Sequence, residues 1–348
     1  MSDVYQVSYT GDILGHRRCP RAWLYERHVG LRPYEQVQAM EGNLAHFAME
    51  WLTKHYRKHG TYPKATQLEQ EMLKRFSVLR SRGIRSEFAK KAEVVARVVE
   101  VVYPQSVSFP KGAAPVIVET GAIDPIVAKC ISCALHTEYE IKHVRALPAG
   151  HKFSGKKQVL LRGILDLVIQ QEDSMEFSRV YEITDPINLT GSVAEKSIKS
   201  VSGDIEIWDY KASKPDTPYI HDYVRQLLTY AALYHRNNPE EPLPARCVLA
   251  FLRRPKKGTL QDHLIAIPVT QELLDHAESW TMGQITGIGD SISDFIASPA
   301  AAKVGTGGCG TVDKELAKQC TACGQRFDCD PYAKGHVGDC DRSRIDKN

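Results

Sequence analysis

The sequence contains no run of about 18 or more apolar residues, so it offers no segment that fits a membrane-spanning helix. Its first stretch, MSDVYQVSYTGDILGHRRCP, has no apolar core behind a basic start, which excludes a secretory signal peptide there. It has no Walker A stretch of the form G-x4-G-K-S/T, which excludes a P-loop motor, and no internal repeat. We therefore expect a cytoplasmic protein that makes no contact with membranes.

The overall composition is that of an ordinary globular protein. Of the 348 residues, 43% are hydrophobic and 25% are charged, which is enough to bury a core in one large domain or two. The net charge of +3 is too small to indicate a partner. Nine cysteines are an odd number, and a chain of this size does not depend on disulfides. Clustered cysteines in a reducing compartment are therefore interpreted first as metal or cluster ligands.

Positive charge is concentrated in two places. Residues 74–97 carry eight lysines and arginines against Glu87 and Glu93, and a second basic group, RRPKK, occupies residues 253–257. Basic stripes of this kind suit the phosphate backbone of a nucleic acid. A solvated helix surface has the same composition, so charge alone leaves both interpretations open.

The periodicity of apolar residues predicts three parts: a helical region over 1–110, a mixed region over 111–297, and a linker with a cysteine segment over 298–348. In the mixed region, residues 114–130 and 133–147 are rich in β-formers. The predicted helices cover 36–59, 65–79, 86–103, 217–237 and a stretch from 271 onwards; the predicted strands cover 158–170, 204–213, 245–254 and 263–270.

Two strands carry residues suited to hydrolysis of phosphodiesters. Asp166 lies in the apolar stretch LRGILDLV, where a carboxylate is costly to bury unless it is paired or binds a metal. Asp209 and Lys211 are two apart in IWDYKAS and so share one face of a strand. Two carboxylates can hold hard cations such as Mg²⁺ or Mn²⁺, and a lysine can position water or neutralise charge on the phosphate. By themselves these residues fit a surface salt bridge and a lone buried aspartate better than they fit a catalytic site.

Further residues add to this pattern. His46 lies in GNLAHFAME on a predicted helix, and Gln226 and Tyr230 are four apart on the helix that follows the Lys211 strand. Cys19 precedes Pro20, whereas three more cysteines stand together near the other end of the chain as C-x2-C-x5-C. These three are Cys320, Cys323 and Cys329.

The whole set, in this order, resembles the RecB-like branch of the PD-(D/E)XK nucleases that carry an iron–sulfur cluster, such as the AddB nuclease and the CRISPR-adaptation exonucleases. The resemblance implies a restriction-endonuclease-like α/β core with a mixed central sheet flanked by helices. It also implies a metal-dependent exonuclease acting on single-stranded DNA ends, in DNA repair and recombination or in CRISPR and antiphage defence. The motifs that carry it are RCPRAW, GNLAHF, GILD, DYKAS, QLLTY and CTACGQRFDC.

The resemblance assigns a role to each matching position. His46, Asp166 and Asp209, with the backbone carbonyl of Tyr210, match the ligands of Mg²⁺ or Mn²⁺. Lys211 matches the catalytic lysine, and Gln226 and Tyr230 match a pair that steadies the site and contacts DNA. The four remaining positions match the ligands of a [4Fe–4S] cluster: Cys19, Cys320, Cys323 and Cys329.

Several alternatives remain. The late cysteines also fit a zinc site completed by His336 or Cys340, in a zinc-stabilised endonuclease that cuts duplex DNA. The interval between Asp166 and Asp209 is unusually long for this family, so residues 171–203 are expected to form an extended hairpin or flap. That insertion favours a subunit active mainly with a helicase, an integrase or another defence protein.

Other acidic residues and cysteines receive structural interpretations. Glu138 and Glu140 are expected in cross-strand salt bridges or in solvent, although a carboxylate at such a place can join a metal site. Glu206 is expected on the strand face opposite Asp209. The remaining cysteines of the middle region, Cys130, Cys133 and Cys247, are expected to pack in the core.

Overall fold

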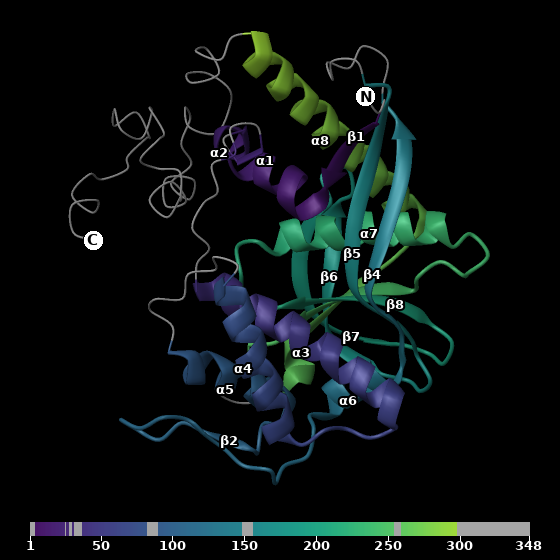
Figure 1. Ribbon diagram of the computed structural model, residues 1–348. Coiled ribbons are helices and arrows are strands. Elements are labelled where there is room, and N and C mark those ends of the chain that lie inside the picture. The colour runs from purple at the N-terminus through teal and green to yellow at the C-terminus, as the bar shows by residue number, and fades with distance from the viewer. Residues whose placement is uncertain are drawn as a thin grey trace. The chain divides into compact units, whose positions relative to one another are not determined.

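The computed structural model describes residues 4–24, 26–27, 30, 37–81, 90–147, 156–253 and 259–297 (Figure 1). They belong to two compact units, one of residues 1–34, 142–163 and 278–348 and the other of residues 35–141 and 164–277. We call these unit 1 and unit 2 and describe each by itself. Among the described residues, no helix is long and apolar enough to cross a membrane. Several predicted features lie outside them: Cys320, Cys323, Cys329, His336, Cys340, Arg82, Arg85 and residues 254–257.

Unit 2 is built on a mixed sheet with the strand order β5-β8-β9-β10-β6-β7, and β4 pairs with β5 off this path. Along the order from β5 to β7, neighbouring strands are antiparallel except for β8 with β9 and β10 with β6, which are parallel. The expected mixed central sheet is therefore confirmed. The strands are β4 (Ala134–Ala146), β5 (Gln158–Gln170), β6 (Glu176–Asp185), β7 (Thr190–Lys199), β8 (Ile205–Lys211), β9 (Arg246–Phe251) and β10 (Leu264–Pro268).

Helices flank this sheet on both faces. One face packs against four helices in a single apolar cluster, to which Trp208 and Tyr210 of β8 contribute. The other face packs against α7, as the contacts of α7 with β8 and β9 show. The four helices are α3 (Val37–His59), α4 (Ala65–Ser81), α5 (Lys91–Val102) and α6 (Pro125–Ser132); α7 spans Ile220–Asn237.

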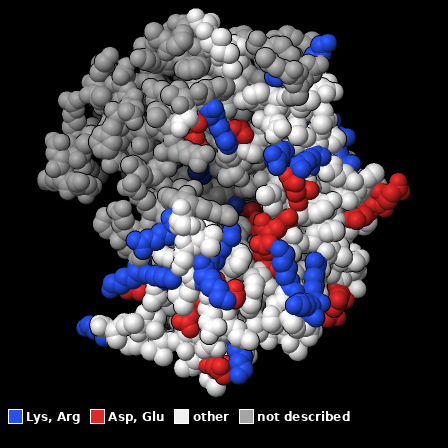
Figure 2. Space-filling view, viewed as in Figure 1, with Lys and Arg blue, Asp and Glu red and all other residues white. Residues whose placement is uncertain are grey.

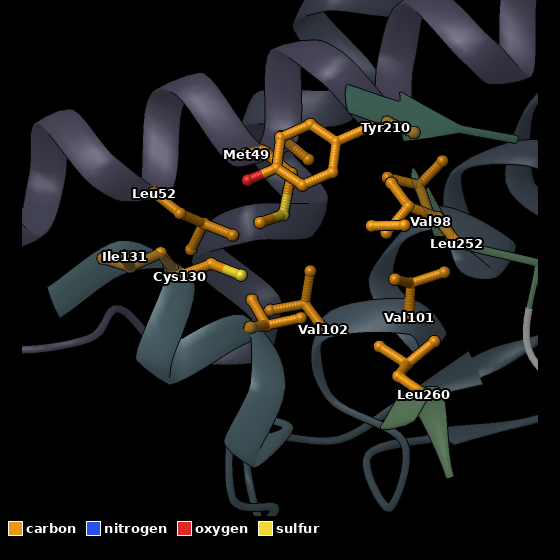
Figure 3. Packing of buried hydrophobic residues seen from close by; sticks show 14 of the residues in the cluster. Met49, Leu52, Val98, Val101, Val102, Cys130, Ile131, Tyr210, Leu252 and Leu260 are labelled. Atoms are coloured by element: carbon orange, nitrogen blue, oxygen red, sulfur yellow. The ribbon is translucent and has the colours of Figure 1, made fainter. Parts of the chain in front are cut away.

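The apolar cluster holds β8 in place beneath α3. Figure 3 shows the ring of Tyr210 beside Met49 of α3, with Val102 of α5 and Cys130 of α6 in the same cluster. Each large apolar side chain buried in this way contributes about 1.5–3 kcal/mol to folding. Because Tyr210 is anchored on this face, its neighbours Asp209 and Lys211 are turned to the face that α7 covers.

Most of the predicted elements form close to their expected bounds. The helix expected over 36–59 is α3, and Gly60 follows it with a φ of 68°, a left-handed conformation that suits glycine at a helix end. The β-rich expectation for 114–130 is wrong in part, because residues Pro125–Ser132 form α6. There the Asp124 side chain accepts a hydrogen bond from the amide of Ile126, and Pro125 occupies the first helical position. Only short strands β2 (Val107–Ser108) and β3 (Val116–Ile117) precede it.

The insertion over 171–203 forms the hairpin of β6 and β7. It is joined to the sheet through β10, where Val180 pairs with Ala266, so β7 is the last strand in the sheet order. Arg225 of α7 reaches the turn of this hairpin and donates a hydrogen bond to the backbone carbonyl of Asn188 at 2.9 Å. The expected extended hairpin is present, and its pairing makes it a continuation of the central sheet.

Unit 1 contains a parallel pair of strands, because β1 (Val4–Ser8) pairs with Gln158–Arg162 of β5. After β1 the chain makes a π-helical turn and two short helices, and Cys19 stands between these helices. The buried carboxylate of Asp12 holds this segment together, since it accepts hydrogen bonds from the amide of Ser8 at 2.7 Å and from the indole of Trp23 at 3.1 Å. The remaining elements are the turn Tyr9–Leu14, α1 (Gly15–Arg18), α2 (Pro20–Leu24) and α8 (Gln271–Ala297), of which the part from residue 278 belongs to this unit.

Candidate active site

The antiparallel pairing of β5 with β8 brings Asp166 and Asp209 together. Leu167 pairs with Trp208, so the register places Asp166 opposite Asp209 one step further along. Both carboxylates are buried, with 8% and 5% of the residue exposed. The backbone amide of Tyr210 donates a hydrogen bond of 2.7 Å to Oδ2 of Asp166, which fixes the orientation of that carboxylate.

His46 reaches this pair from α3. Its Nδ1 lies 3.1 Å from Oδ1 of Asp166, so the two side chains form a hydrogen-bonded ion pair when the imidazole is protonated. The edge of its ring also faces the ring of Tyr210, with 6.2 Å between the ring centroids. The helical position of His46 therefore places an imidazole directly on one of the two carboxylates.

Glu138 of β4 joins the same group, which differs from its expected place in a salt bridge or in solvent. Its carboxylate, His46 and Asp166 offer donor atoms that all lie within 4.8 Å of one another. Glu138 has a φ of 49°, a left-handed conformation that side chains other than glycine rarely adopt. Glu140 is exposed, as expected. No sequence pattern indicated the left-handed backbone that separates these two glutamates.

Lys211 lies beside Asp209 and is held by α7. Its Nζ forms an ion pair with Asp209 Oδ2 and donates a hydrogen bond of 3.1 Å to Oε1 of Gln226. The amide of Gln226 in turn donates to the Tyr230 hydroxyl at 3.4 Å. The Lys211 ammonium also lies 4.4 Å from the ring centroid of Tyr223, a residue of α7 that sequence reasoning did not single out.

We refer to His46, Glu138, Asp166, Asp209 and Lys211 as the Asp209 cluster. Burial raises the pKa of Asp209 to about 6 even though Lys211 lowers it, and burial together with Asp166 raises the pKa of Glu138 to about 7. Burial alone lowers the pKa of His46, but Asp166 more than offsets this and raises it to about 9. His46, Lys211 and the amide of Tyr210 keep the pKa of Asp166 below its usual value in spite of burial, so the two aspartates of the pair are shifted in opposite directions.

The donor set of this cluster fits a hard divalent cation. Carboxylate oxygens are the ligands that Mg²⁺ and Mn²⁺ prefer, and imidazole is a common additional ligand for Mn²⁺. A cation among these groups would also balance the crowded negative charge, because it would favour the ionised form of each carboxylate. The structure therefore brings together all the residues of unit 2 that were predicted as metal ligands or catalytic residues. They are His46, Asp166, Asp209, Tyr210, Lys211, Gln226 and Tyr230.

A second buried acidic group lies on the opposite face of β8, where Glu206 was expected. Glu206 is fully buried and accepts hydrogen bonds from Gln171 at 2.8 Å and from the Trp208 indole at 2.9 Å. Arg246 forms an ion pair with Glu206 and another, of 2.8 Å, with Asp204. We call Gln171, Asp204, Glu206, Trp208 and Arg246 the Glu206 cluster.

The cysteines of unit 2 pack in the core as expected. Cys130 and Cys133 are 3% and 7% exposed, and Cys247 is fully buried. Burial raises the pKa of the Cys130 thiol well above its usual value, which disfavours the thiolate that metals bind. In unit 1, Cys19 is half-buried, and its Sγ accepts a hydrogen bond of 3.4 Å from the amide of Ala22.

The basic stretch over 74–97 is partly neutralised by acidic neighbours. Lys74 pairs with Glu71, and Arg97 lies 3.3 Å from Glu41, whereas Arg80 is exposed on α4. Figure 2 shows acidic side chains gathered near the middle of the visible face, with lysines and arginines below them where Figure 1 shows α3 and α4. Mixed charge of this kind is compatible with both interpretations of the stretch.

Comparison with known proteins identifies one family. The family model described as the PD-(D/E)XK nuclease superfamily matches residues 15–183 and 188–329. The matched ranges include all residues of the Asp209 cluster, and the interruption, residues 184–187, covers the last two residues of β6 and the first two of the turn that leads to β7. No curated protein matches this chain.

Proposed function

The chain belongs to the PD-(D/E)XK nuclease superfamily, and we propose that it is a metal-dependent deoxyribonuclease whose Asp209 cluster hydrolyses phosphodiester bonds. The observation that carries this proposal is the arrangement around β8, where Asp166 and Asp209 face each other in a buried setting and Lys211 is ion-paired with Asp209. Two buried carboxylates this close together lower the stability of the fold unless a cation binds between them. Their presence therefore indicates a function that needs both.

In this proposal Asp166, Asp209 and His46 hold Mg²⁺ or Mn²⁺, together with the backbone carbonyl of Tyr210. When bound, the cation polarises the scissile phosphate and lowers the pKa of a water molecule. The amide of Tyr210 keeps the Asp166 carboxylate oriented for this task through its 2.7 Å hydrogen bond. Asp166 in turn keeps His46 in place, so two protein contacts position two of the ligands before a cation arrives.

Lys211 acts on the phosphate side of the reaction. Its ammonium stays protonated because Asp209 and Asp166 raise its pKa in spite of burial. A fixed positive charge there stabilises the negative charge that develops on the phosphate oxygens and helps to orient the attacking water. Gln226 holds Lys211 and is itself bonded to Tyr230, so α7 positions the lysine through two buried side chains.

The proposed substrate is the end of a single DNA strand. Support comes from the resemblance to the RecB-like exonucleases and from exposed basic residues such as Arg80 and Lys91 on α4 and α5. A role in DNA repair and recombination or in CRISPR and antiphage defence follows from the same resemblance. Covalently closed circular substrates separate this exonuclease from an endonuclease, because only an endonuclease cuts a strand that has no ends.

We further propose that Cys19, Cys320, Cys323 and Cys329 bind a [4Fe–4S] cluster that joins the three late cysteines to the junction between α1 and α2. The support is the C-x2-C-x5-C spacing and the position of Cys19 directly before Pro20. Iron and sulfide are measured in anaerobically purified protein. Cys19→Ser is expected to remove the brown colour, whereas a colourless protein whose zinc is lost in Cys340→Ser supports the zinc site instead.

The test of the nuclease proposal is cleavage of end-labelled single-stranded DNA in the presence of Mn²⁺, with Lys211→Met as the matched inactive variant. Wild-type protein is expected to release labelled products, and the variant is expected to bind the DNA without cutting it. Full cleavage by Lys211→Met would show that another site is responsible.

A second candidate is a subunit that cleaves DNA only when a helicase, an integrase or another defence protein is bound. The β6–β7 hairpin favours it, because β7 is the last strand of the sheet order and the hairpin is an addition to the family's short connection. The pure protein would then bind Mn²⁺ at the Asp209 cluster but leave labelled DNA intact until the partner is added.

A further inference from the structure

The conformation of Glu138 departs from that of the strand around it. β4 runs over 13 residues, yet Glu138 has a φ of 49° within it. In this left-handed region the Cβ atom of any residue other than glycine crowds its own backbone, which costs free energy. Such a conformation persists only where the surrounding structure requires it, and it is found most often at functional sites.

The departure has a visible consequence for the side chains. In a regular strand, Thr137 and Glu138 would point to opposite faces. Here the Thr137 hydroxyl donates a hydrogen bond of 3.3 Å to the backbone carbonyl of Asp166, while the Glu138 carboxylate lies in the group of donor atoms with Asp166 and His46. The left-handed residue thus brings two successive side chains to the same aspartate.

Among the described residues, His46 and Lys54 favour the ionised form of Glu138 from a distance, but burial and Asp166 outweigh them and raise its pKa to about 7. Within that part of the chain, no hydrogen bond or ion pair of the Glu138 carboxylate is found. His46 could supply a positive charge, but its Nδ1 already lies 3.1 Å from Oδ1 of Asp166. A carboxylate that is brought beside a second carboxylate by an unfavourable backbone conformation, without a bond of its own, is the arrangement expected of a cation ligand.

We propose that Glu138 is a further ligand of the divalent metal, bound jointly with Asp166 and His46. This inference rests on the proposed function, since it assigns one more residue to the same metal. A third carboxylate provides more oxygen ligands and more negative charge than two aspartates, and both raise affinity for a hard cation. Glu138 therefore strengthens metal binding from a strand that lies outside the β5–β8 pair.

Binding of Mn²⁺ to the full chain, measured by calorimetry and by electron paramagnetic resonance without DNA, tests the proposal. Glu138→Gln keeps the size of the side chain and is expected to weaken Mn²⁺ binding by at least about 10-fold, because loss of a residue that only supports a metal ligand already costs about 10–100-fold. Glu140→Gln is the matched control, because Glu140 is two residues away on the same strand and exposed. Its Mn²⁺ affinity is expected to equal that of the wild type.

A second variant separates metal binding from folding. Glu138→Gly removes the carboxylate and also suits the left-handed backbone, so in EDTA it is expected to melt at a higher temperature than Glu138→Gln while binding Mn²⁺ equally weakly. Wild-type Mn²⁺ affinity in both Glu138 variants would overturn the proposal.

The outcome of this test is distinguishable from failure of the nuclease function itself. If wild-type protein and both Glu138 variants bind Mn²⁺ alike and wild-type protein cuts DNA, then only the role of Glu138 is wrong. If wild-type protein neither binds Mn²⁺ nor cuts DNA, the proposed function fails, and the role of Glu138 fails with it.

Discussion

Two buried acid–base clusters share strand β8, and they differ in how their charges are balanced. Glu206 lies three residues before Asp209, on the opposite face. Its carboxylate is surrounded by fixed donors, namely the amide of Gln171, the indole of Trp208 and the guanidinium of Arg246. The chain itself therefore satisfies the Glu206 cluster, which is the condition under which a buried charge is tolerated as part of a core.

The Asp209 cluster lacks this balance. Asp209 has Lys211 as its ion-pair partner, but it faces Asp166, and Glu138 adds a third carboxylate nearby. A raised pKa does not distinguish the two clusters, because burial raises the pKa of Glu206 as well as that of Asp209. The number of fixed donors around each carboxylate does distinguish them, and it separates a structural cluster from one suited to a metal and a reaction.

Asp209→Asn is expected to produce the largest effect, a loss of nuclease activity. The variant should cleave labelled single-stranded DNA at least about 10³-fold more slowly in Mn²⁺, because a neutral amide is a poor ligand for a hard cation and no longer balances Lys211. Asp166 still faces the lysine, so the protein should remain folded. Initial rates and a melting curve measure both effects; a rate within about tenfold of the wild type, a barrier change of only about 1.4 kcal/mol, would contradict the assignment.

Arg246→Ala is expected to lower the stability of the fold instead of the activity. It leaves Glu206 buried without its cation, and it removes the ion pair with Asp204, so the free energy of unfolding should drop by about 3–5 kcal/mol. Urea unfolding measures the loss, and the cleavage rate per folded molecule should not change.

The matched control for Arg246→Ala is Lys196→Ala, which breaks the exposed ion pair with Glu182 on the β6–β7 hairpin. Exposed pairs contribute only about 0–1 kcal/mol, so the control should unfold close to the wild type. An Arg246→Ala protein that is as stable as this control, or that is folded but inactive, would contradict the structural role of the Glu206 cluster.

Mn²⁺ is expected to stabilise the folded protein through the Asp209 cluster. At about 100 times the dissociation constant, a cation that binds only the folded state adds about 2.7 kcal/mol to the free energy of unfolding. Wild-type protein should show this gain, EDTA should abolish it, and Asp166→Asn should not show it. Thermal melting with and without Mn²⁺ measures the difference, and an equal gain in Asp166→Asn would place the cation elsewhere.

The two glutamines bound to these clusters give the smallest pair of effects. Gln226→Ala removes a hydrogen bond to the Lys211 ammonium, worth about 1.5–3 kcal/mol, and should slow cleavage by about 10–100-fold. Gln171→Ala removes a hydrogen bond to Glu206 and should lower stability by about 1–3 kcal/mol without slowing cleavage. If both variants slowed cleavage, or if both only lowered the free energy of unfolding, the division into a catalytic and a structural cluster would be contradicted.

Local patterns were enough to predict much of this arrangement. The alternation of residues in a strand placed Glu206 and Asp209 on opposite faces, and the four-residue spacing placed Gln226 and Tyr230 on one side of α7. The helix that carries His46 was predicted from its apolar periodicity. These features depend on residues close together in the chain, which is why they could be predicted from the sequence.

Features that depend on distant contacts or on single dihedral angles were missed or ranked second. The sequence left open that Glu138 joins a metal site but favoured a salt bridge or solvent, because no residue type nearby indicates its left-handed φ. Tyr223 faces Lys211 because α7 packs beside β8, a tertiary contact. The helix α6 replaced expected strand because Asp124 and Pro125 form a strong helix start, which outweighs the β-forming side chains that follow.

The most direct test of the central claim is anomalous X-ray scattering from a crystal of the protein containing Mn²⁺. The account predicts a peak in contact with the carboxylates of Asp166 and Asp209, beside His46, and no peak at Glu206. A Mn²⁺-saturated crystal with no peak at Asp166 and Asp209, or with its peak at the Glu206 cluster, would contradict the assignment of the two faces of β8.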